Sequence, residues 1–98
     1  MGWATRYAAA LKCGETVRFR PRGHSMTGRV NDGQLVTVEP LPNGGANVGD
    51  VVLCRVDGRE YLHLVKARDG GEYLIGNNKG KVNGWTRHVF GVVTKIEP

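Results

Sequence analysis

The residues best suited to chemistry are a serine in a glycine-containing segment and a basic side chain further along. Ser25 lies within Gly23-His24-Ser25-Met26, directly after a run that alternates like a strand. A serine hydroxyl is unreactive at neutral pH unless a neighbouring base accepts its proton. Two later residues, His63 and Lys66, have side chains that could accept it. The sequence therefore suggests a serine nucleophile assisted by one of two bases.

Histidine is the better candidate for this base. An imidazole titrates near pH ~6.5 without help, whereas a lysine must fall from a pKa of ~10.4 towards ~7–8, which costs roughly 3–4 kcal/mol of desolvation. Positions 63 and 66 point to opposite faces of a strand, so both side chains face Ser25 only if a bulge intervenes. We predict His63 as the base and keep Lys66 as the alternative. Lys66 is also typical of an edge-strand lysine whose stem lies along the protein.

Several segments follow Ser25 in a fixed order. They are Asp32-Gly33-Gln34-Leu35-Val36, Val48-Gly49-Asp50-Val51-Val52, Tyr61-Leu62-His63-Leu64-Val65, Gly76-Asn77-Asn78 and Phe90-Gly91-Val92-Val93. Together they resemble the serine-dyad peptidase superfamily that contains type I signal peptidases and the self-cleaving LexA-like repressors. The resemblance covers residues 16–96, which is nearly the whole chain.

This resemblance implies a coiled, mostly antiparallel β-sheet and a serine endopeptidase, a hydrolase that cleaves a peptide or protein substrate. It places the nucleophile at Ser25, and it assigns Gly23, His24 and Met26 to the loop that stabilises the oxyanion. Family members use a lysine base or, in archaeal and endoplasmic-reticulum signal peptidases, a histidine. Aligned through Gly76-Asn77-Asn78, His63 falls on the base position.

The chain departs from the family pattern at two places, and other polar residues have modest roles. Gly28 stands where relatives usually have proline, and Gln34 stands where an acidic residue is common. Neither position takes part in the chemistry, so these departures affect the expected substrate contacts more than the dyad. Asp50 and Asp32 are possible supporting residues by position, but each lies in an Asp/Gly turn where aspartate caps its own backbone. We expect Asp50 to be structural.

No metal or cofactor site is expected. The three histidines show neither HxxxH nor HxH spacing, which argues against a metal centre. His24 is expected near the substrate cleft, and His88 at the surface ahead of the last strand.

The elements that position these residues are short. The spacing predicts a helix within residues 1–14 that ends at Gly14. Its apolar face has large side chains at i, i+4, i+7 and i+8, namely Trp3, Tyr7, Ala10 and Leu11. Strands are predicted over 16–22, 35–39, 51–56, 60–67, 72–75 and 89–96, with a hairpin turn at Asp57-Gly58. Residues 41–49 and 77–84 are expected to be loops. The fold class is mainly β with a short N-terminal helix.

Length and composition limit the remaining possibilities. The 98 residues suit one domain, with the helix in 1–14 and a peptidase-like β domain in 15–98. No apolar run approaches the ~20 residues that cross a bilayer, and the start lacks the layout of a secretory signal. We therefore expect a cytoplasmic protein with no membrane span. Cys13 and Cys54 form no CxxC pair and are expected to be idle thiols, with a disulfide left open. The sequence leaves the oligomeric state open.

Two other function classes stay open. The first is a catalytically silent peptidase fold that serves as a binding module, since geometry and not sequence separates it from an enzyme. The second, minor one is nucleic-acid binding, because the net charge is +5 and Arg18, Arg20 and Arg22 share one strand face. No aromatic residues alternate with these arginines as a stacking platform requires. We therefore do not expect nucleic acid as a partner.

Overall fold

A computed structural model describes residues 2–23, 26 and 28–98. The described chain forms one helix followed by strands that build a single sheet. The elements are α1 (Thr5–Lys12), β1 (Val17–Phe19), β2 (Leu35–Pro40), β3 (Val51–Val56), β4 (Arg59–Asp69), β5 (Glu72–Gly76), β6 (Val82–Thr86) and β7 (His88–Glu97). The prediction of a mainly β fold with a short N-terminal helix is confirmed.

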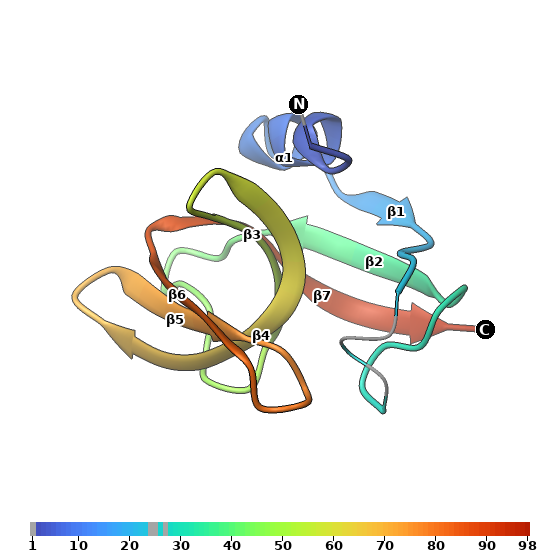
Figure 1. Ribbon diagram of the computed structural model, residues 1–98. Helices are drawn as coiled ribbons and strands as arrows, with labels where there is room; N and C mark the ends of the chain where they lie inside the picture. Colours follow the sequence, from blue (N-terminus) through green and yellow to red (C-terminus); the bar gives the residue numbers. More distant parts are fainter. Residues whose placement is uncertain (1, 24–25, 27) are drawn as a thin grey trace.

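The sheet is antiparallel throughout, with the strand order β1-β2-β7-β3-β4-β5-β6. Strand β7 therefore lies between β2 and β3, although it follows all the others in the sequence. Figure 1 shows β1, β2 and β7 on one side of the molecule and the strongly curved β3–β6 on the other. The sheet has two halves that β7 joins.

The hairpin of β3 and β4 is the element that the sequence predicts best. Its turn is Asp57-Gly58, where both residues have positive φ, 49° and 80°, as a two-residue hairpin turn with matching twist requires. Alternate residues of β3 enter two different apolar clusters. Val51 and Leu53 belong to the cluster under α1, whereas Val52, Cys54 and Val56 belong to the cluster inside the curved half.

Irregular pairing bends the curved half back on itself. The register shifts at Leu53/Cys54, Val65/Ala67 and Ile75/Gly76, and bulges of this kind increase strand twist and bending. As a result β6 reaches β3, where the Thr86 hydroxyl donates to the Arg55 carbonyl at 2.5 Å. The sheet curls in this way without closing into a barrel.

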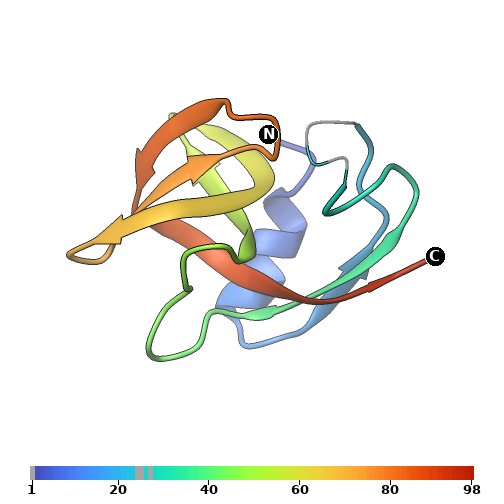
Figure 2. The same cartoon turned by 90° about the horizontal axis from the view of Figure 1, so that it is seen from below.

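Helix α1 covers the face of β1, β2 and β7 (Figure 1, Figure 2). The predicted helix face is wrong in detail, because the helix begins at Thr5 and the residues that it buries are Ala8 and Leu11. Trp3 precedes the helix and remains 52% exposed. No helix in the described part of the chain has the length and apolar character needed to cross a bilayer.

The loop predicted over residues 77–84 holds for 77–81 and is wrong from Val82 onward. Strand β6 begins at Val82 and pairs with β5. Its sequence contains Asn83 and Gly84, which local propensity assigns to a turn, so the pairing with β5 overrides that preference.

Candidate active site

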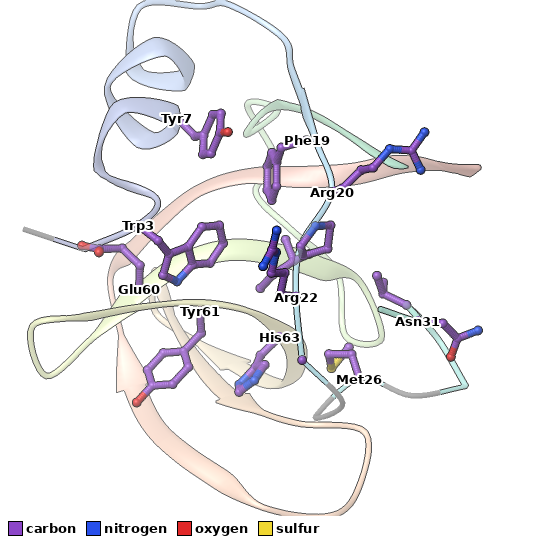
Figure 3. Close-up of a pocket in the computed structure, with 14 residues that line it drawn as sticks. Trp3, Tyr7, Phe19, Arg20, Arg22, Met26, Asn31, Glu60, Tyr61 and His63 are labelled. Atoms are coloured by element: carbon purple, nitrogen blue, oxygen red, sulfur yellow. The ribbon is translucent and has the colours of Figure 1, made fainter. Parts of the chain in front are cut away.

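A cavity of about 510 Å³ lies between the start of β4 and the segment that follows β1. This volume is within the usual range of ligand sites in proteins. Figure 3 shows side chains from three parts of the chain around it, namely the N-terminal segment with α1, the end of β1 with the residues after it, and β4. The cavity therefore depends on all three.

The cavity brings together several of the residues that the sequence singled out. His63, Gly23 and Met26 all line it. His24 and Ser25 lie outside the described residues. Gly23 and Met26 flank this pair in the sequence, so described residues on both sides of 24–25 share a cavity with His63.

The segment from Arg20 to Gly23 is fixed to the segment before β2 by three hydrogen bonds. The Gly23 N–H donates to Asp32 Oδ1 at 2.8 Å, and Arg20 Nη1 donates to the Gly33 carbonyl at 2.7 Å. The Gly33 N–H donates to the Pro21 carbonyl at 3.4 Å. Asp32 therefore supports a distant residue, where the sequence suggested that it caps its own turn.

Gly23 has a conformation that glycine alone adopts readily. Its φ is +115°, outside the regions that are comfortable for residues with a Cβ. Its N–H already donates to Asp32. Gly23 thus shapes the loop, and its own N–H is not available to an oxyanion.

Met26 anchors the other side of this loop. Its side chain is buried in the cluster under α1, and its carbonyl accepts hydrogen bonds from the N–H groups of Arg29 and Val30 at 2.9 and 2.8 Å. Arg29 and Val30 are therefore tied back to Met26.

His63 is held in a defined orientation at the wall of the cavity. It is 7% exposed, and its ring stacks on Tyr61 with 4.9 Å between centroids. Its Nδ1 is 2.7 Å from Asn83 Oδ1. Because a carboxamide oxygen can only accept, Nδ1 carries the proton and Nε2 presents a lone pair.

The surroundings favour neutral His63. Burial lowers the pKa of its imidazole, the hydrogen bond to Asn83 raises it, and the charge of Lys81 lowers it; the net direction is downward. The neutral form is the one that accepts a proton, so the site favours a general base.

Asn83 is a site residue that sequence reasoning missed. It lies on β6, twenty residues from His63, and the curvature of the sheet brings it there. Asn77 supports this arrangement, since its Oδ1 accepts from the N–H groups of Lys79 and Lys81 at 2.8 and 2.9 Å. The only signal in the sequence is the Asn-rich composition of this segment, which by itself favours a loop.

The alternative base, Lys66, lies elsewhere. It stands at the register shift between Val65 and Ala67, so the bulge that both bases would need is present. Its stem, however, lies over Gly76, where Lys66 Cε is 2.9 Å from the place a Cβ would occupy. Lys66 is not among the described residues that line the cavity.

Asp50 and His88 also lie outside the cavity lining. Asp50 Oδ2 accepts from the Asn47 N–H at 2.8 Å within its own turn, and the Asp50 carbonyl accepts from the Val65 N–H at 2.9 Å. His88 is exposed at the start of β7. In the described part of the chain, no three His, Cys, Asp or Glu residues are grouped as metal ligands.

Comparison with models of protein families identifies a relationship. Residues 8–86 match a family model described as Peptidase S24-like. The matched range runs from α1 to the end of β6 and includes the cavity-lining residues Gly23, Met26 and His63, together with Asn83. No curated protein matches the chain.

Proposed function

The chain belongs to the Peptidase S24-like family, and we propose from this premise that it is a serine endopeptidase. The membership agrees with the LexA/signal-peptidase-like superfamily expected from the ordered segments. In the proposal Ser25 is the nucleophile and His63 the general base. The observation that carries it is that His63 lines one cavity with Gly23 and Met26.

The proposed reaction proceeds through an acyl-enzyme. Nε2 of His63 takes the Ser25 hydroxyl proton while Oγ bonds to the substrate carbonyl carbon, giving a tetrahedral oxyanion. The imidazolium then gives this proton to the leaving amine as the C–N bond breaks. A water molecule, deprotonated by His63, attacks the ester, and the released Ser25 oxygen regains the proton. No cofactor takes part.

Asn83 has the role of a positioning residue in this proposal. Its hydrogen bond to Nδ1 selects the tautomer whose Nε2 can accept the serine proton. A carboxylate in this place would stabilise the imidazolium more strongly, whereas a neutral amide leaves the pKa of His63 low.

The oxyanion requires N–H donors in the same loop. Gly23 donates to Asp32, so we assign the donors to the backbone N–H groups of Ser25 and Met26. Asp32 would act indirectly, by holding the loop that presents them.

The edge of β4 suits an extended peptide substrate. Residues 59–62 pair with β3 on one side, and pairing with β5 starts only at Leu64. No described strand pairs with the other edge of residues 59–62, and residues 60–63 line the cavity. A peptide added to this edge would gain main-chain hydrogen bonds beside His63.

Peptide cleavage tests the proposal. Purified protein is incubated with a proteome-derived peptide library, and new termini are identified by mass spectrometry. We expect new termini with the wild-type chain and none with Ser25→Ala or His63→Ala. Ser25 is the only serine in the sequence, so no other serine can replace it.

The control is Lys66→Ala, which should cleave like the wild type. Circular dichroism and thermal unfolding verify that each variant folds. If the wild type and Ser25→Ala give the same termini, the peptidase proposal is wrong, and the fold is a catalytically silent binding module. If Lys66→Ala alone is inactive, the base assignment is wrong.

A further inference from the structure

The cavity extends well past His63 to an aromatic wall at the N-terminal end of the molecule. Phe19 of β1 stacks on Tyr7 of α1 with 4.4 Å between centroids. Trp3 meets Phe19 edge-on at 5.6 Å. Figure 3 shows Tyr7 and Phe19 at one end of the cavity, Tyr61 with His63 at the other, and Trp3 between them. Large apolar surface therefore borders the space next to the proposed base.

Trp3 is the exposed part of this wall. It is 52% exposed although it contacts Phe19, and exposed aromatic surface beside a hollow is typical of a binding site. The cavity of about 510 Å³ has room for at least one large side chain beside it.

The second component of the cavity is positive charge. Arg20 and Arg22 line it directly after Phe19. Arg20 donates to the Gly33 carbonyl, whereas Arg22 is exposed and forms no hydrogen bond or ion pair with any described residue. Arg22 is thus a cation available to a ligand.

Glu60, the one acidic residue among the described lining residues, does not neutralise these arginines. Its Oε2 pairs with Arg55 Nε at 2.9 Å, and its side chain is only 4% exposed. The backbone of Gly2 lies so close to the other carboxylate oxygen, Oε1, that a Cβ added at Gly2 would overlap it. The side of the cavity that a peptide can reach is therefore positive.

We propose that this cavity is a specificity pocket for a peptide segment with a large aromatic side chain packed on Trp3 and an acidic side chain paired with Arg22. The inference rests on the proposed function, since it names the class of substrate that the dyad would cleave. The aromatic ring removes the exposed face of Trp3 from water, and the carboxylate forms a charge-assisted pair with the guanidinium.

The test is direct binding to the Ser25→Ala chain, which separates recognition from cleavage. The probe is an acetylated and amidated octapeptide, Ala-Asp-Ala-Phe-Ala-Asp-Ala-Ala, with both acids on the same strand face as the ring. One comparison peptide replaces Phe with Ala, and another replaces both Asp residues with Lys. Dissociation constants are measured by calorimetry.

We expect the Phe/Asp peptide to bind at least about tenfold more tightly than either comparison peptide. Trp3→Ala should abolish the preference for Phe, and Arg22→Glu should abolish the preference for Asp. Arg18→Glu is the matched control. Arg18 is exposed on β1 and does not line the cavity, and its replacement by Glu changes the net charge by the same amount as Arg22→Glu. It should keep both preferences.

Equal affinity for the Phe and Ala peptides overturns the proposal, as does an equal loss in Arg18→Glu and Arg22→Glu or the absence of any binding. These outcomes are distinct from failure of the peptidase proposal. A chain that binds with the expected preference but cleaves nothing would disprove catalysis and keep the pocket. A chain that cleaves peptides without this preference would keep the peptidase proposal and disprove the pocket.

Discussion

At the scale of single residues, the neutral partner of His63 sets the properties of the site. Asn83 fixes the ring through Nδ1 at 2.7 Å without adding a negative charge. Burial therefore dominates and lowers the pKa of His63. A base with a lowered pKa remains neutral in more acidic solution, so the proposed enzyme should keep its activity to lower pH than an unshifted histidine would allow.

Replacing this partner should move the pH profile. Asn83→Asp places a carboxylate beside the imidazole and should raise the pKa of His63. Activity requires the neutral imidazole, so the acidic limb of kcat/KM should shift to higher pH. The measurement is peptide cleavage between pH 4 and 8.

Two variants complete this experiment. Lys81→Met removes a charge that lowers the pKa of His63. The acidic limb of its kcat/KM profile should therefore also move to higher pH, but less far than in Asn83→Asp. Asn83→Ala should lower kcat/KM by at least about tenfold at every pH, because the tautomer is no longer fixed. An unchanged profile in Asn83→Asp would refute the positioning role.

The two cysteines should differ sharply in reactivity. Both are free, with Cys13 exposed and Cys54 buried, and burial raises the pKa of Cys54 to about 12. Because the thiolate is the reactive form, a thiol reagent at pH 8 should label one cysteine in the folded chain and two in the unfolded chain. Cys13→Ser should remove the labelling of the folded chain, and any remaining rapid reaction would contradict this.

At the scale of elements, the turn between β5 and β6 controls the base from a distance. Asn77 is 8% exposed, and its Oδ1 accepts from Lys79 and Lys81. The turn also needs Gly76, because a Cβ there would be 2.5 Å from the Lys81 carbonyl oxygen. The position of Asn83 follows from this tight turn.

Removing the Asn77 side chain should weaken both the fold and the site. Asn77→Ala loses two hydrogen bonds and should lower the free energy of unfolding by about 1–3 kcal/mol, measured with urea. Peptide cleavage should fall as well, because Asn83 is no longer held against His63. Lys79→Ala changes an exposed side chain of the same turn and should behave like the wild type. If Asn77→Ala and Lys79→Ala unfold and cleave alike, the turn does not hold Asn83 against His63.

The elements also show how far the sequence could be interpreted. The β3–β4 hairpin was predictable because its turn signal, Asp57-Gly58, is local. Strand β6 was not, because its residues favour a turn and its pairing comes from the curvature of the whole sheet. The pairing of His63 with Asn83 was missed for the same reason, since no spacing rule relates side chains on strands separated by β5.

At the scale of the whole molecule, the proposed site depends on two halves of one sheet. Gly23 and Met26 belong to the half with β1 and β2, and His63 to the half with β3–β6. Strand β7 joins them, and it packs tightly at Gly91. A Cβ there would be 2.5 Å from the Glu39 carbonyl oxygen and 3.0 Å from Leu11 Cδ2.

A methyl group at this junction should therefore destabilise the fold. Gly91→Ala should lower the free energy of unfolding by about 1–3 kcal/mol, because backbone and core must shift. Gly44→Ala is the matched control, since a Cβ at Gly44 meets nothing within 4 Å, and it should stay within about 0.5 kcal/mol of the wild type. Urea unfolding measures both, and equal stability of the two variants would contradict the close packing.

The position of β7 has a consequence for folding during synthesis. A ribosome completes β1–β6 before it begins β7, and until then β2 and β3 have no strand between them. On an unfinished chain no strand therefore joins the half that contains Gly23 and Met26 to the half that contains His63. The proposed activity should accordingly start only after β7 has been added.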